Sequence, residues 1–195
     1  MHSAPRPHWP NGERWVSIWT RLPILRTVDT IDPLRTVAVV LDGTDREFLV
    51  YGTVLPWHAD VGDAQEQPAP KYWAEHRRVV TEQASEWKAL HDQMPRTSLI
   101  VAGDWNTDLL AGSGTTPRPY GLSREVQLIE ETMAILGLAI PTQGMADPCP
   151  QRFFLIDHVA VPGGNAVVTT REPVGRTGAV LSDHPLVLVT LLFGH

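Results

Sequence analysis

The chain has 195 residues, of which 43% are hydrophobic, and a formal charge of −6 at pH 7. This length and composition suit one domain with a sizeable core, while the acidic balance gives no general attraction to nucleic acid or to an anionic membrane. The single cysteine, Cys149, requires no oxidising compartment, and no stretch approaches the roughly 18 apolar residues of a membrane span. Because residues 1–14 form an irregular lead-in without the apolar centre of a secretory signal, we expect a cytoplasmic protein.

Apolar periodicity predicts an alternation of strands and helices after the lead-in. The first half is expected to contain strands at 15–19, 34–41 and 48–55, a helix at 71–94 and a buried strand at 99–104. The second and third of these strands should pair antiparallel, because the turn Asp42-Gly43-Thr44-Asp45 between them is typical of a hairpin.

The second half follows the same alternation. We expect a helix from 123 to 136 with Gly137 as its C-cap, a hairpin of 153–161 with 166–170, and a final apolar strand at 186–193. The glycine-rich segment 110–121 between the two halves is long enough to be a functional surface loop.

Polar side chains interrupt or flank three of these strands. Asp104 lies at the end of the buried strand at 99–104 and Asn106 follows it, and the two residues either form a turn or belong to an active site at the strand's end. Asp157 lies inside an apolar strand and needs a specific hydrogen-bond partner, because burying a polar group without one costs roughly 2 to 7 kcal/mol. His184, just before the last strand, is the partner that we expect, since a carboxylate can orient an imidazole and stabilise its charged form. His158 points to the opposite face of its strand, which favours a structural or surface role.

An acid, an amide and a histidine that converge on one edge suit phosphoester hydrolysis. That reaction needs a base for the attacking water and cationic or hydrogen-bonding groups around the phosphoryl oxygens. The sequence contains no G-x-S-x-G nucleophile motif, and the loop 110–121 lacks the Lys-Ser/Thr ending of a P-loop.

Three short motifs resemble those of the endonuclease/exonuclease/phosphatase superfamily. Gly103-Asp104-Trp105-Asn106 is similar to its G-D-x-N motif, Ile156-Asp157-His158-Val159 to its I-D-H/Y motif, and Ser182-Asp183-His184-Pro185 to its S-D-H-x motif. Arg21-Leu22-Pro23-Ile24 is similar to its S-R-x-P-I segment, and the motifs occur in the family's order over residues 15–195. The resemblance implies an α+β, four-layered α/β/β/α sandwich of the DNase I type.

The resemblance also implies roles for matching positions. Asp104 would orient or deprotonate the attacking water, and Asn106 would hold the scissile phosphate. His184 would stabilise the transition state with Asp157 behind it, and Asp183 would lie at or near a divalent cation, Mg²⁺ or Mn²⁺. The implied substrate is a phosphoester, either a nucleic acid or a small phosphorylated molecule.

Two departures from the family pattern bear on activity. Family members begin with a strand carrying an Asn and another ending in a metal-binding Glu, and nothing before Trp15 supplies either, so we expect an upstream segment or a partner to complete the sheet. Val54 stands where the family has a catalytic His or Tyr, and His58 in the following loop is a candidate substitute for binding substrate. A catalytically degenerate member that binds a phosphorylated ligand or a partner is therefore the alternative to a metal-dependent phosphodiesterase. An unrelated α/β scaffold, in which these residues only satisfy turns and strand ends, is a third.

Overall fold

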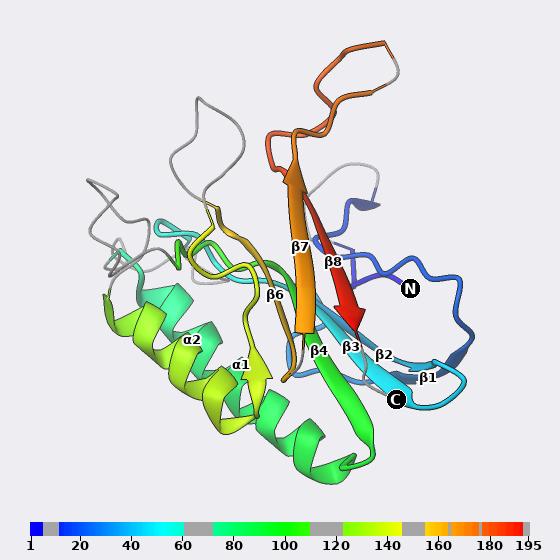
Figure 1. Cartoon of the computed structure of the whole chain (residues 1–195). Coiled ribbons are helices and arrows are strands. Elements are labelled where there is room, and N and C mark those ends of the chain that lie inside the picture. The colour runs from blue at the N-terminus through cyan, green and yellow to red at the C-terminus, as the bar shows by residue number, and fades with distance from the viewer. Residues whose placement is uncertain are drawn as a thin grey trace.

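The computed structural model describes residues 1–5, 12–60, 72–109, 123–145, 155–163, 165–175 and 177–192. Within them the chain forms two sheets and two long helices (Figure 1). The larger sheet has six strands in the order β1-β2-β3-β4-β6-β5. These strands are β1 (Ile24–Val28), β2 (Thr36–Asp42), β3 (Glu47–Val54), β4 (Thr97–Asp104), β5 (Leu138–Ala139) and β6 (Asp157–Pro162). The predicted loop at 110–121, most of the loop after His58, Cys149 and residues 153–154 lie outside the described residues.

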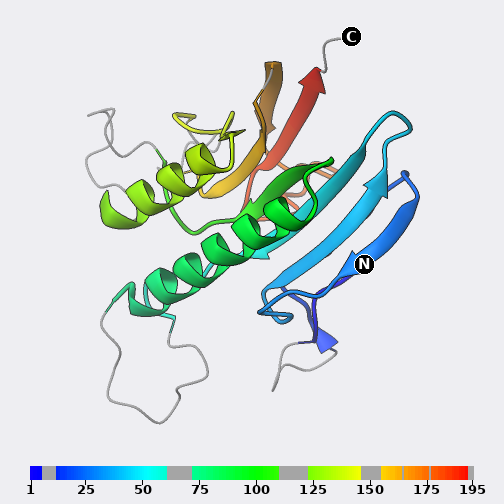
Figure 2. The ribbon, with the colours of Figure 1, turned by 90° about the horizontal axis from the view of Figure 1, so that it is seen from below.

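Helices α1 (Ala74–Gln93) and α2 (Ser123–Ile135) lie side by side on one face of this sheet (Figures 1 and 2). Both helices place apolar side chains at helical spacing, and these side chains join alternate residues of the strands in one buried cluster. Gly137 closes α2 with a φ of 67°, and its N–H donates to Ala134 O, as expected for a left-handed C-cap. The core therefore lies between the helices and the sheet.

The hairpin of β2 with β3 follows the predicted pairing, from Thr36 opposite Thr53 to Asp42 opposite Glu47. Helix α1 then returns the chain so that β4 pairs in parallel with β3. Strand β6 pairs antiparallel with β4 on its other side, and Asp157 is opposite Asp104. The carboxyl ends of β3 and β4 and the start of β6 therefore share one edge of the sheet.

The predicted hairpin of 153–161 with 166–170 is wrong. β7 (Asn165–Arg171) pairs instead with β8 (Leu186–Leu192) in a separate two-stranded sheet, from Asn165 opposite Leu192 to Arg171 opposite Leu186. A short glycine-containing connection favours a hairpin locally, but the longer ladder with β8 satisfies more backbone hydrogen bonds. The two-stranded sheet approaches the larger one between β6 and β8 (Figure 1).

The predicted strand at 15–19 is also wrong, because only an isolated bridge between His2 and Ser17 forms there. This segment crosses the sheet face opposite to α1, where Val16 and Ile18 lie against Gly52. A Cβ on Gly52 would come within 2.7 Å of the Val16 side chain, so a glycine permits this close approach. β1 is not among the predicted strands, although Ile24 begins it directly after Pro23.

Candidate active site

Asp104 ends β4 at a turn that only glycine permits. Gly103 has a φ of 146°, a backbone conformation that L side chains rarely adopt, and a Cβ there would lie 1.8 Å from the carbonyl oxygen of Thr53 on β3. This close approach of two parallel strands fixes where the Asp104 side chain leaves the sheet.

The Asp104 carboxylate is held by Asn106, two residues further along. The Asn106 backbone N–H donates to Asp104 Oδ1 at 2.8 Å, and its side-chain Nδ2 donates to Asp104 Oδ2 at 3.1 Å and to Leu55 O at 2.8 Å. Because the Leu55 carbonyl can only accept, the Asn106 nitrogen must face it. Asn106 therefore forms the predicted turn and also orients the Asp104 carboxylate.

Asp157 and His184 complete the cluster. His184 Nδ1 lies 2.8 Å from Asp157 Oδ2, and one ligand atom each from Asp104, Asp157 and His184 lie within 4.8 Å of one another. All three side chains are partly buried. The ring of His184 is oriented by Asp157 through Nδ1, the pairing that we expected from the sequence.

Burial and neighbouring charges shift the pKa values of His184 and Asp104 in this cluster. The hydrogen bond that His184 Nδ1–H donates to Asp157, supported by the Asp157 charge, raises the pKa of His184 to about 9, so the imidazole is cationic at neutral pH. Burial, together with the charges of Asp157 and Asp183, raises the pKa of Asp104 to about 6 even though the Asn106 N–H opposes the shift. The cluster thus pairs a carboxylate that titrates near neutral pH with a cationic imidazole.

Comparisons with solved structures identify the fold. The chain aligns with the 3'-5' exonuclease NExo of Neisseria meningitidis at a TM-score of 0.57 and 18% identity, covering 88% of this chain and 69% of that one. It aligns with truncated TDP2 of Caenorhabditis elegans at a TM-score of 0.52 and 10% identity, covering 88% of this chain and 67% of that one. It also aligns with a beta toxin mutant of Staphylococcus aureus with bound magnesium ions at a TM-score of 0.51 and 12% identity, covering 87% of this chain and 62% of that one. The chain has the DNase I-like fold. It spans about two thirds of the length of these structures. No family model and no curated protein matches the sequence.

The predicted α+β class is confirmed, and the DNase I-like fold explains why distant motifs meet. Of the other two predicted site residues, Asp183 is exposed beside the cluster, and the Ser182 Oγ next to it accepts the His184 N–H at 3.0 Å. His58 is not part of the carboxylate–imidazole cluster among the described residues. Its ring stacks on that of Tyr72 at 5.6 Å and meets that of Trp57 edge-on at 5.2 Å.

Behind this edge of the DNase I-like sheet lies a buried polar network in which His158 has a structural role, one of the two predicted for it, whereas His76 was not singled out from the sequence. His76 of α1 contacts Thr107 and the Trp105 carbonyl, and His158 of β6 contacts the Thr107 carbonyl and Thr142. A signal for His76 was available, because it shares the helical spacing of the buried residues Val80, Gln83, Trp87 and Leu90. A histidine on the buried face of a helix needs polar partners.

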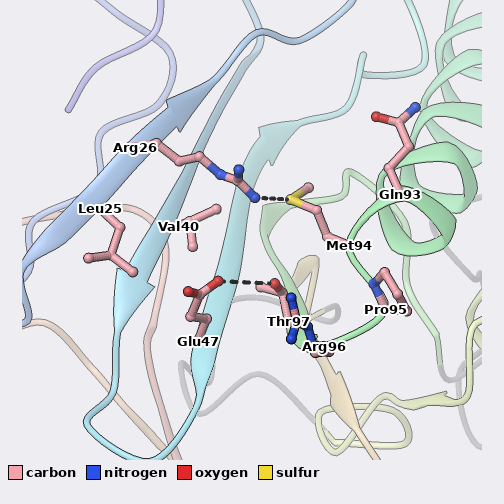
Figure 3. Close-up of a pocket in the computed structure, with 9 residues that line it drawn as sticks. All are labelled: Leu25, Arg26, Val40, Glu47, Gln93, Met94, Pro95, Arg96 and Thr97. Carbon is pink, nitrogen blue, oxygen red and sulfur yellow. Dashed lines mark hydrogen bonds between the residues drawn. The ribbon is translucent and has the colours of Figure 1, made fainter.

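One further cavity is formed at the opposite end of β4 (Figure 3). It has a volume of about 590 Å³ and is lined by Leu25, Arg26, Val40, Glu47, Gln93, Met94, Pro95, Arg96 and Thr97. In Figure 3 the Arg26 guanidinium points to the Met94 sulfur and the Glu47 carboxylate to the Thr97 hydroxyl. These two charged side chains therefore form hydrogen bonds with other residues that line the cavity. Because Thr97 begins β4 and Asp104 ends it, this cavity is separated from the cluster by roughly 20 Å of strand.

Proposed function

We propose that this protein is a phosphodiester hydrolase that depends on a divalent cation. The observation that carries the proposal is the juxtaposition of Asp104 with the hydrogen-bonded pair of Asp157 and His184 at one sheet edge. The DNase I-like fold supports it, because the aligned structures include a 3'-5' exonuclease and a magnesium-bound toxin.

The chain's own residues divide the reaction between them. Asp104, with a pKa of about 6, accepts the proton of the attacking water at neutral pH. His184 donates a hydrogen bond from Nε2 to a phosphoryl oxygen, while Asp157 holds its Nδ1 and keeps the ring cationic. Asn106 fixes the Asp104 carboxylate and reaches the phosphate only by exchanging one of its present hydrogen bonds.

The donor set suits a hard divalent cation. Asp104, Asp157 and the exposed Asp183 bring three carboxylates to one cationic imidazole, and the charges of Asp157 and Asp183 raise the pKa of Asp104. Carboxylate oxygens are the ligands that Mg²⁺ and Mn²⁺ prefer, and Asp183 with Asp104 or Asp157 would hold the ion. When bound, it supplies positive charge to the phosphoryl oxygens.

Turnover of bis-p-nitrophenyl phosphate by the purified chain tests this proposal. We expect hydrolysis with Mg²⁺ that EDTA abolishes and that falls by at least about 10²-fold in Asp104→Asn and His184→Ala. Arg96→Ala, which changes the distant cavity, is the matched control and should retain full activity. Hydrolysis that survives in Asp104→Asn and His184→Ala would overturn the assignment.

Catalytic degeneracy is the second candidate, because Val54 lies directly opposite Asp104 in the β3–β4 register. An apolar side chain there offers neither a proton nor a hydrogen bond to a phosphate. A folded protein that binds a nucleoside monophosphate in EDTA without hydrolysing any phosphodiester would favour this candidate.

A further inference from the structure

Two buried histidines that the proposed reaction does not use lie on either side of the segment that carries Asn106. His76 reaches it from α1 and is fully buried, and His158 reaches it from β6 and is 2% exposed. Nδ1 of His76 has no hydrogen-bond partner among the described residues, so the contacts of this ring are those of Nε2, whereas both nitrogens of His158 have partners.

His76 holds the residue before Asn106. Its Nε2 lies 3.2 Å from Trp105 O and 3.0 Å from Thr107 Oγ1. Because a carbonyl oxygen can only accept, Nε2 carries the hydrogen and the ring donates. Burial lowers the pKa of His76, so the ring that donates is the neutral one.

His158 holds the residue after Asn106. Its Nε2 lies 3.0 Å from Thr107 O, and its Nδ1 lies 3.0 Å from Thr142 Oγ1. Because the Thr107 carbonyl can only accept, Nε2 carries the hydrogen, and burial lowers the pKa of His158, so Nδ1 of the neutral ring accepts from the Thr142 hydroxyl. Nε2 is therefore the protonated nitrogen of a neutral ring, and it donates to Thr107 O.

Asn106 itself needs such support. Its φ of 47° is in the left-handed region, which asparagine tolerates better than most non-glycine residues but which is still less populated than the right-handed region. Its side chain must also stay in reach of both Leu55 O and Asp104 Oδ2. The two carbonyls that the histidines bind, those of Trp105 and Thr107, are the ones on either side of Asn106 in the chain.

We propose that His76 and His158 are positioning residues that clamp the backbone on both sides of Asn106 and so hold the carboxamide that orients the Asp104 carboxylate. This inference rests on the proposed hydrolase function. A merely structural role would stabilise the domain without any specific coupling to Asn106.

A double-mutant cycle tests the clamp. We expect His76→Leu to lower kcat by about 10- to 10²-fold with a much smaller change in KM, because a small misplacement of a catalytic group is costly. His76→Gln, whose amide nitrogen can donate from nearly the position of Nε2, should recover most of kcat. In an Asn106→Ala background, His76→Leu should lower kcat by less than about twofold further, because the group it positions is already gone.

Val80→Ala is the control for a loss of stability alone. Val80 is fully buried one turn further along α1, so its truncation weakens the core without removing any of these hydrogen bonds. We expect kcat to remain within about twofold of the wild type below the melting transition. Equal losses from His76→Leu in the wild-type and Asn106→Ala backgrounds would overturn the clamp, and so would a failure of His76→Gln to restore kcat.

A second measurement does not require turnover. The NMR signals of the Asn106 side-chain amide, assigned by their loss in Asn106→Ala, should shift towards those of a free amide in His76→Leu and in His158→Leu. They should stay in place in His76→Gln and Val80→Ala. If the wild type hydrolyses nothing, the proposed function fails and this readout still decides the clamp; unmoved signals in both leucine variants would overturn it.

Discussion

The imidazole of His184 and the carboxylate of Asp157 meet at 2.8 Å although they belong to different sheets. Asp157 begins β6 of the larger sheet, and His184 precedes β8 of the smaller one. This hydrogen bond therefore connects the larger sheet with the segment that leads into the smaller one, and it raises the pKa of the imidazole.

Removal of the Asp157 charge should neutralise His184 at physiological pH. The hydrogen bond to Asp157 is the main reason why the pKa of His184 is about 9, so in Asp157→Asn we expect it to fall towards the usual value of 6.5. Titration of the ring signals by NMR in EDTA measures this directly. Asp183→Asn is the control and should change this pKa much less, because the Asp183 charge contributes least. A wild-type midpoint near 6.5 would contradict the prediction.

The same pair should make stability depend on alkaline pH. A histidine whose pKa is higher in the folded state than in the unfolded state stabilises the fold fully below about 6.5 and loses that contribution as the pH rises through 9. Urea unfolding should therefore show the wild type losing stability over this window. Asp157→Asn should give a flatter profile, and identical pH profiles for the two proteins would count against the pairing.

His158 should have the opposite effect at acid pH. Burial lowers its pKa from 6.5 to about 4, so the unfolded state binds a proton before the folded state does. The pH dependence is therefore opposite to that of His184. The contribution of His158 to the free energy of unfolding is constant above pH 6.5 and falls by about 3 kcal/mol as the pH drops towards 4. The measurement is the difference between the urea-unfolding free energies of the wild type and His158→Gln, which cannot titrate. A difference that is constant between pH 7 and pH 4 would exclude this contribution.

Metal binding should be visible without a substrate. A ligand that binds only the folded state at ten times its dissociation constant stabilises it by about 1.4 kcal/mol. Mg²⁺ should therefore raise the thermal midpoint of the wild type, and EDTA should reverse the rise. Asp183→Asn and Asp104→Asn should each weaken the shift, whereas Arg96→Ala should preserve it. A thermal midpoint that is insensitive to Mg²⁺ and Mn²⁺ would favour the catalytically degenerate, ligand-binding protein over the metal-dependent hydrolase.

Predictions from the sequence succeeded where the signal was local. The hairpin of β2 with β3, the strand that ends at Asp104 and the two helices follow from apolar periodicity and from the Asp42-Gly43 turn. The strands that pair here are neighbours in the sequence: β2 and β3 are joined by a short turn, and β3 and β4 are joined by one helix.

The errors concern contacts that no local pattern records. β7 pairs with β8 rather than β6, and the segment at 15–19 crosses the sheet instead of joining it. Pairing across long stretches of chain depends on which faces remain to be buried once the core has formed. The pairing of Asp157 with His184 could be expected, because a carboxylate inside an apolar strand needs a polar partner. The helical spacing of His76 could indicate that it is buried, but not that it contacts the segment around Asn106.

Gly103 provides the most direct test of how the sheet edge that carries Asp104 is built. An alanine Cβ would lie 1.8 Å from Thr53 O, and the φ of 146° is unfavourable for any side chain, so the strands β3 and β4 would have to separate. We expect Gly103→Ala to lower the free energy of unfolding by about 3 kcal/mol or more. Gly137→Ala is the matched control: it also has a positive φ, 67°, but nothing lies within 4 Å of its Cβ, so about 1 kcal/mol is expected. Equal losses in the two variants, measured by urea unfolding, would show that the close approach of β4 to Thr53 does not constrain the position of Asp104.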